Sequence, residues 1–67
     1  MSELKQLRLL KGLSQERMAR MIDVSTFTYA KIERGAAPSR IFIEKTKRAF
    51  PEIDINSVFF NSIVKEA

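Results

Sequence analysis

Only three residues, Asp23-Val24-Ser25, separate two stretches of helical pattern near the middle of this chain. In the first stretch, Met18, Ala19 and Ile22 recur at the spacing of one helix face. In the second stretch, Tyr29 and Ile32 have the same helical spacing. A connection this short makes two consecutive helices meet at a sharp angle, which is the arrangement of a helix-turn-helix motif.

Capping and breaking residues divide the rest of the chain. Residues whose side chains can accept a backbone N–H precede four helical stretches: Ser14, Ser25, Ser39 and Asp54. A glycine or proline follows three: Gly12, Gly35 and Pro51. We therefore expect helices at about 3–11, 15–22, 26–34, 40–50 and 55–64. No segment has the alternation and turns of a hairpin, so the expected fold class is all-α, with residues 1–67 as one domain.

The composition argues against most classes of enzyme. The 67 residues include no Cys and no His, which excludes metal sites built on those ligands and Ser-His or Cys-His nucleophile pairs. Carboxylates such as Glu52 and Asp54 allow acid–base chemistry in principle, but Asp54 is better explained as a helix cap. We expect no enzyme activity, cofactor, metal or small-molecule ligand. No apolar run suits a signal peptide or membrane span, so we expect a cytoplasmic protein without membrane contact.

Positive charge is concentrated in the first fifty residues. Residues 1–50 carry eleven Lys and Arg against five Asp and Glu, a net charge of +6. Residues 51–67 carry one basic and three acidic residues, a net charge of −2. This asymmetry favours a body that binds a polyanion and a tail with another role, although a solvated basic surface would have the same composition.

Three short motifs separate a DNA-binding protein from a helical bundle with no DNA role. Gly12-Leu-Ser-Gln-Glu-Arg-Met-Ala19 is followed by Asp23-Val-Ser25 and Lys31-Ile-Glu-Arg-Gly35. Together they resemble the Cro/C1-type helix-turn-helix family, which includes lambdoid phage Cro, repressor DNA-binding domains and xenobiotic-response-element regulators, over about residues 4–60. The resemblance implies a lambda repressor-like, five-helix fold. It also implies that the third helix enters the major groove and that dimers read two half-sites one DNA turn apart.

The resemblance also implies roles for individual residues. Three positions of the third helix match residues that face base edges: Thr26, Phe27 and Lys31. Lysine can donate to guanine O6 and N7, and threonine can hydrogen-bond or contact a thymine methyl. Phe27 can offer only an apolar contact to thymine, and its alternative is packing on a neighbouring side chain. Five residues are candidates for contact with the DNA backbone: Gln15, Thr28, Arg34, Ser39 and Arg40. For the last three, simple solvent exposure is the alternative.

Other positions have structural interpretations. The family commonly pairs the positions of Arg8 and Glu33 in a salt bridge, so we expect this pair to tie the first helix to the third; two independent surface charges are the alternative. Tyr29 is expected in the core, with a phosphate contact by its hydroxyl as the alternative. Asp23 replaces the usual glycine of the turn, and aspartate tolerates a left-handed backbone better than most residues.

The acidic tail has more apolar residues than one terminal helix needs for docking. Phe59 resembles a core position, whereas Phe60, Ile63 and Val64 are predicted to extend into a homodimer interface. The alternative is that all of them cover their own core. The adjacent Leu9 and Leu10 fall on the outward side of the first helix, where two apolar residues together can mark a contact surface.

These observations predict a regulator that binds double-stranded DNA with sequence specificity. We expect a small dimeric repressor of phage or mobile-element type that reads a palindromic operator. The competing hypothesis is a protein-interaction module on the same fold, an anti-repressor or antitoxin-like protein, with Leu9, Leu10, Phe27 and the apolar tail as its working surface.

Overall fold

Five α-helices follow one another in the computed structural model, which describes residues 3–59. They are α1 (Glu3–Leu10), α2 (Gln15–Ile22), α3 (Thr26–Glu33), α4 (Arg40–Ala49) and α5 (Ile55–Phe59). Residues 3–59 contain no strand, and the all-α, five-helix prediction is confirmed. The expected fifth helix ran to residue 64, and its part beyond Phe59 lies outside the described residues.

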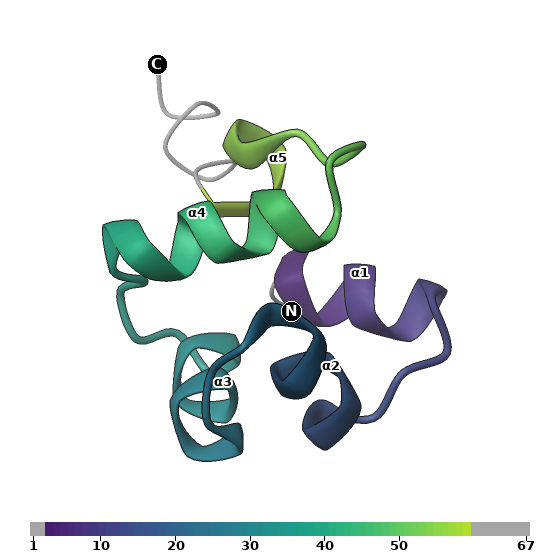
Figure 1. The fold of residues 1–67 in the computed structure, drawn as a ribbon, viewed down its shortest axis with the longest axis vertical. Helices are drawn as coiled ribbons and strands as arrows, with labels where there is room; N and C mark the ends of the chain where they lie inside the picture. The colour runs from purple at the N-terminus through teal and green to yellow at the C-terminus, as the bar shows by residue number, and fades with distance from the viewer. Residues whose placement is uncertain (1–2, 60–67) are drawn as a thin grey trace.

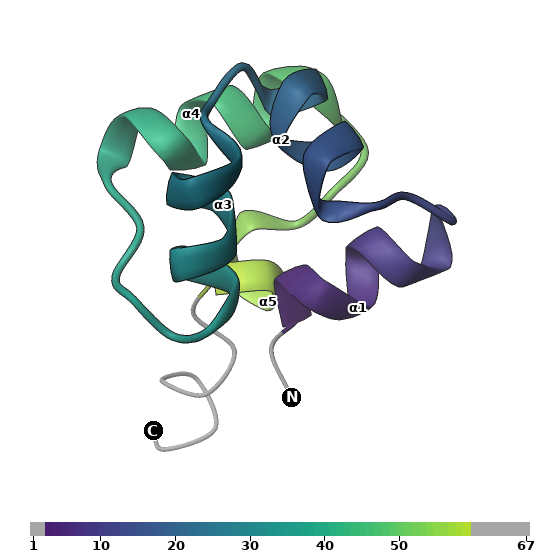
Figure 2. The ribbon, with the colours of Figure 1, turned by 90° about the horizontal axis from the view of Figure 1, so that it is seen from below.

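The helices pack around a central α2. This helix contacts both α3 and α4, while α1 packs against the short α5 (Figures 1 and 2). In Figure 1, α4 lies across the molecule above α2 and α3, and α1 lies on the opposite side of α2 from α3. The two helices of the central motif are thus supported from two sides, by α4 and by α1.

Serine caps begin three of the helices, as the sequence indicates. The hydroxyl oxygen of each cap accepts a backbone N–H three residues later, at 3.0–3.1 Å: Ser14 from Arg17, Ser25 from Thr28, and Ser39 from Phe42. Each such cap typically contributes about 1 kcal/mol, because it satisfies a donor that has no partner inside the helix. Local sequence therefore determines where α2, α3 and α4 start.

Left-handed residues end the first two helices. Gly12 has φ 68° and Asp23 has φ 72°. At the end of α2, the backbone N–H groups of Asp23 and Val24 both donate to the carbonyl oxygen of Ala19, at 2.9 and 3.0 Å. The chain consequently reverses within three residues, and α3 begins at a sharp angle to α2 (Figure 2).

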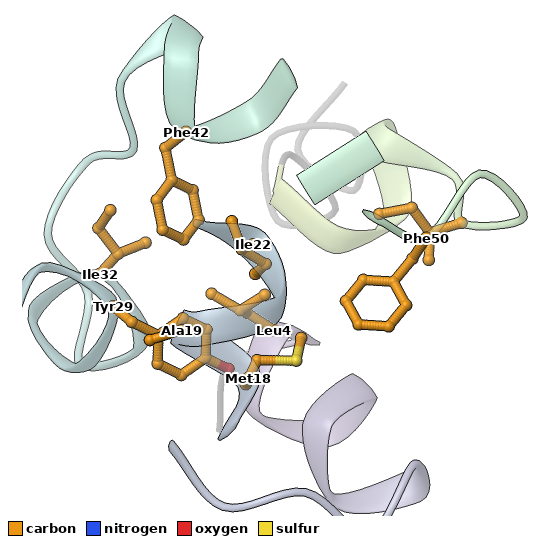
Figure 3. Packing of buried hydrophobic residues seen from close by; sticks show 9 residues of the cluster. Leu4, Met18, Ala19, Ile22, Tyr29, Ile32, Phe42 and Phe50 are labelled. Carbon is orange, nitrogen blue, oxygen red and sulfur yellow. The ribbon is translucent and has the colours of Figure 1, made fainter. Parts of the chain in front are cut away.

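The apolar core joins α2, α3 and α4. Met18 and Ile22 of α2 meet Tyr29 of α3 and Phe42 of α4, all almost completely buried (Figure 3). The rings of Tyr29 and Phe42 lie 6.3 Å apart between centroids, and Phe59 meets Phe42 edge-on at 6.1 Å. These separations fall within the favourable range for aromatic pairs.

Part of the apolar tail belongs to this same core. Ile53 is buried, and Ile55, Val58 and Phe59 are partly buried against the core cluster. For these four residues, the structure agrees with the interpretation that they cover their own domain. The three residues predicted to form a dimer interface, Phe60, Ile63 and Val64, lie outside the described residues.

Candidate nucleic-acid interface

One side of α3 is anchored in the protein and another faces solvent. Tyr29, Ile32 and Glu33 are buried, whereas Thr26, Phe27 and Lys31 are exposed. The three exposed residues are those that the sequence assigns to base contacts, and the fold brings them together on one eight-residue helix. A helix held by one face and open on the other has the shape that can enter a DNA groove.

Phe27 and Lys31 also contact one another. The Phe27 side chain is 71% exposed, and the Nζ atom of Lys31 lies 5.7 Å from its ring centroid. A cation at this distance from an aromatic face is attracted by the ring quadrupole. Phe27 therefore does not pack into the core, and its neighbour is the ammonium group one helical turn further along α3.

The start of α3 is held by a pair of hydroxyl groups. Besides accepting the Thr28 N–H, the Ser25 hydroxyl donates to Thr28 Oγ1 at 2.9 Å. Thr28, a candidate for DNA backbone contact, is partly buried at this position. Its own hydroxyl hydrogen is not used in this bond, because the oxygen acts as the acceptor, so Thr28 can still donate to a phosphate.

Gln15 has a partner that the sequence did not predict. Its Nε2 atom donates to Glu33 Oε1 at 2.8 Å, which joins the start of α2 to the end of α3. A side-chain amide carries two N–H donors. The bond to Glu33 uses one of these donors. The second N–H of Gln15 can reach a phosphate only in the side-chain orientation that this bond imposes.

The remaining backbone candidates lie on either side of the loop between α3 and α4. Arg34, Ser39 and Arg40 are all exposed. Arg34 forms no ion pair with another residue of the 3–59 segment, whereas Arg40 lies 3.3 Å from Glu44 Oε2 in an exposed pair. Ser39 uses its oxygen as the cap of α4 and keeps its hydroxyl hydrogen. Of the two arginines in this group, Arg34 is therefore the more available cation.

Arg8 and Glu33 form a buried ion pair between α1 and α3. Arg8 Nε lies 2.8 Å from Glu33 Oε2, and Arg8 Nη2 lies 3.2 Å from Glu33 Oε1. The two side chains are only 11% and 4% exposed. A further donor of Arg8, Nη1, bonds the backbone oxygen of Leu13 at 2.8 Å. The guanidinium group thus connects α1, the following turn and α3.

Tyr29 completes the set of donors around Glu33. Its hydroxyl is buried and donates to Glu33 Oε2 at 2.7 Å. The alternative in which this hydroxyl contacts a phosphate is wrong for this structure, because the group lies inside the protein and is bonded to a carboxylate. Burial opposes ionisation of Glu33, but the hydrogen bonds from Arg8, Tyr29 and Gln15 together outweigh it and lower the Glu33 pKa to about 2. Burial and Glu33 together raise the pKa of Tyr29.

Lys45 of α4 holds the turn between α2 and α3. Its Nζ atom donates to the backbone oxygen of Asp23 at 2.8 Å and lies 3.6 Å from Asp23 Oδ2. Sequence reasoning missed this contact, because the two residues are 22 positions apart and Lys45 belongs to none of the quoted motifs. It also missed Arg20, which lines a shallow hollow together with Ser25 and Thr26. The excess of basic residues was the only signal for Arg20.

The fold and the exposed face of α3 define a helix-turn-helix protein. A family model described as helix-turn-helix matches residues 4–50, more than half of the chain. The chain belongs to this family, the Cro/C1-type helix-turn-helix group of DNA-binding regulators. No curated protein and no solved structure matches it significantly.

Two other features are absent from the described segment. No helix of residues 3–59 is long and apolar enough to cross a membrane. The same residues contain no cluster of three or more carboxylates able to hold a metal ion.

Proposed function

We propose that this protein is a transcriptional repressor that binds a specific double-stranded DNA sequence and has no catalytic activity of its own. The observation that carries the proposal is the exposed group formed by Thr26, Phe27 and Lys31 on the anchored helix α3. It combines a hydroxyl, an apolar ring and an ammonium group. These can recognise, respectively, a base edge, a thymine methyl and the O6 and N7 atoms of guanine.

Contacts to phosphates would set the orientation of the domain on the duplex. We assign them to side chains with a free donor near α3: Gln15, Thr28, Arg34, Ser39 and Arg40. Arg34 should contribute most, since it is exposed and makes no ion pair within the described segment. Arg40 must compete with Glu44 for its phosphate, which weakens its contribution.

The repressor is proposed to act as a homodimer on a palindromic operator. Since Ile53, Ile55, Val58 and Phe59 pack on their own core, the interface would fall to the last apolar residues, Phe60, Ile63 and Val64. Analytical ultracentrifugation across a concentration series, with and without operator, tests this point. A monomer at tens of micromolar under both conditions contradicts the dimer.

Selection of bound duplexes from a random DNA pool tests the whole proposal. The wild type should select a palindromic site, and Lys31→Ala should select a different or less defined one. Arg48→Ala is a matched control, because Arg48 is an exposed cation on α4, and this variant should select the wild-type site. Failure of the wild type to enrich any site, or unchanged selection by Lys31→Ala, contradicts the assignment of α3 as the reading helix.

A protein-binding role on the same fold is the second candidate, and three exposed apolar side chains favour it. Leu9, Leu10 and Phe27 are 53%, 87% and 71% exposed. Salt dependence separates the two functions. The affinity for DNA, which depends on several phosphate contacts, falls steeply as the salt concentration rises. The affinity of an apolar protein interface does not.

The same proposal implies a cellular location and a direction of regulation. A small repressor of phage or mobile-element type would work in the cytoplasm, where its operator is accessible. Placing the selected site upstream of a reporter gene tests the sign of regulation. Reduced expression supports repression, and increased expression identifies an activator.

A further inference from the structure

Phe27 is the aromatic side chain of α3 that the fold does not use. The other lysine–aromatic contact within residues 3–59 joins Lys11 to Phe50, with Nζ 5.0 Å from the ring centroid. That contact covers the edge of the core, because Phe50 is only 5% exposed and Lys11 also pairs with Glu52. Phe27, at 71% exposure, contributes nothing comparable to the core.

Lys31, which contacts Phe27, is likewise not used by the rest of the fold. Lys31 forms no ion pair with any carboxylate in the described segment, and the group near its ammonium is the Phe27 ring at 5.7 Å. A free lysine side chain on a helix samples many rotamers. Attraction to the ring face restricts Nζ to one side of α3 and to one direction along it.

We propose that Phe27 and Lys31 recognise a thymine and a guanine in the same half-site as one coupled unit. In this inference, which rests on the proposed function, the exposed part of the Phe27 ring contacts the C5-methyl group of thymine. The same ring positions the Lys31 ammonium to donate to both O6 and N7 of guanine. Phe27 therefore serves both as an apolar contact and as a positioning residue for Lys31.

Helix geometry limits how far apart the two bases lie. Phe27 and Lys31 are four residues apart on α3, which corresponds to a rise of about 6 Å. Base pairs along a duplex are about 3.4 Å apart. For a helix lying along the major groove, the thymine and the guanine consequently occupy neighbouring or next-but-one base pairs.

Base analogues in the selected operator test the two contacts separately. Deoxyuridine in place of thymine removes only the C5-methyl group, and 7-deazaguanine in place of guanine removes only the N7 acceptor. Affinity of the full chain for each duplex is measured by fluorescence anisotropy at fixed salt concentration. For the wild type, one thymine per half-site should lose roughly fourfold in affinity when replaced, the value of one buried methyl group. One guanine near it should lose at least about fivefold.

Variants of the two residues then test the coupling. Phe27→Ala should lose sensitivity to both analogues. Phe27→Leu keeps an apolar side chain without a π face, so it should stay sensitive to deoxyuridine and lose most of its sensitivity to 7-deazaguanine. Lys31→Met should stay sensitive to deoxyuridine alone. Leu10→Ala, which removes an even more exposed apolar side chain on α1, is the matched control and should respond like the wild type.

The outcomes separate this inference from the proposed function. If the wild type selects no operator, the proposed function fails. If the wild type selects an operator but Phe27→Ala keeps its sensitivity to both analogues, only the proposed coupling of Phe27 and Lys31 is overturned. If Phe27→Leu remains fully sensitive to 7-deazaguanine, the ring does not position Lys31, and that half of the inference is wrong. Helical circular dichroism and thermal unfolding verify that each variant is folded.

Discussion

The hydroxyl of Tyr29 donates a 2.7 Å hydrogen bond to the carboxylate of Glu33, one helical turn further along α3. Both residues are buried, and the same carboxylate also accepts hydrogen bonds from Arg8 of α1 and Gln15 of α2. Three helices therefore meet at one negative charge. The exposed face of α3 is oriented by this arrangement, since the opposite face carries the carboxylate.

Tyr29→Phe should destabilise the protein without changing its fold. The substitution keeps the ring in the core but removes one donor from a buried carboxylate, a loss of about 1–3 kcal/mol. Urea unfolding followed by circular dichroism measures it. Ser57→Ala, which removes an exposed hydroxyl bonded to Asp54, is the control and should cost less than about 0.5 kcal/mol. Equal stability of Tyr29→Phe and the wild type would contradict the role of the hydroxyl.

Glu33→Gln should be more damaging, because it leaves the Arg8 guanidinium buried without a counter-charge. Removing one partner of a buried ion pair typically costs about 3–5 kcal/mol. Glu44→Gln makes the same chemical change in the exposed Arg40–Glu44 pair, where the expected effect is below about 1 kcal/mol. Comparing the free energies of unfolding of these two variants tests whether burial makes the Arg8–Glu33 pair more important than an exposed pair. Similar losses at both sites would show that the Arg8–Glu33 pair behaves as a surface contact.

Stability should fall in acid through Glu33. Its pKa is lowered from the ordinary value of 4.5 to about 2 in the folded protein. A carboxyl group with a lowered folded pKa contributes stability above the unfolded pKa, and this contribution is lost as pH falls from about 4.5 towards 2. Between pH 6 and pH 3, the loss from this group should be on the order of 2 kcal/mol. Glu33→Gln cannot titrate there, so its urea midpoint should depend less on pH than that of the wild type. Parallel curves for the two proteins would refute the assignment.

Asp23→Gly should stabilise the turn between α2 and α3. Asp23 has φ 72°, a conformation that glycine adopts without a side-chain clash. The backbone oxygen that Lys45 contacts at 2.8 Å remains in the variant, and only the weaker contact at 3.6 Å to the carboxylate is lost. We expect a gain of about 0.5–1 kcal/mol in thermal unfolding for Asp23→Gly and a loss of about 1 kcal/mol for Asp23→Ala. The reverse order would mean that the carboxylate contact outweighs the backbone strain.

Much of the local structure was predictable from short stretches of sequence. The caps Ser14, Ser25 and Ser39 act within three residues of their own positions, and the left-handed Asp23 ends a helix whose pattern stops there. Such features depend on hydrogen bonds that the chain makes with its immediate neighbours, so the residue types alone indicate them. Their order also carries the family resemblance that first indicated DNA binding.

The assignment of α3 as the reading helix came from the sequence, but the state of its side chains did not. Phe27 stays exposed, with Lys31 over its ring, because another face of α3 packs on α2 and meets α4 through the Tyr29–Phe42 ring pair. Gln15 was expected to be a phosphate contact only, and its bond to Glu33 appears once the start of α2 packs beside the end of α3.

The sequence by itself determined the helices, their caps, the tight turn and the class of protein. Tertiary structure alone decided that Gln15 and Tyr29 join Arg8 as donors to Glu33, that Lys45 holds the turn and that the Tyr29 hydroxyl is unavailable to DNA. The physical reason is the range of the interactions. Capping and helix periodicity act over three or four residues, whereas Gln15 and Glu33 are 18 positions apart and Asp23 and Lys45 are 22 apart. Contacts between residues so distant in the chain exist only after the helices have packed.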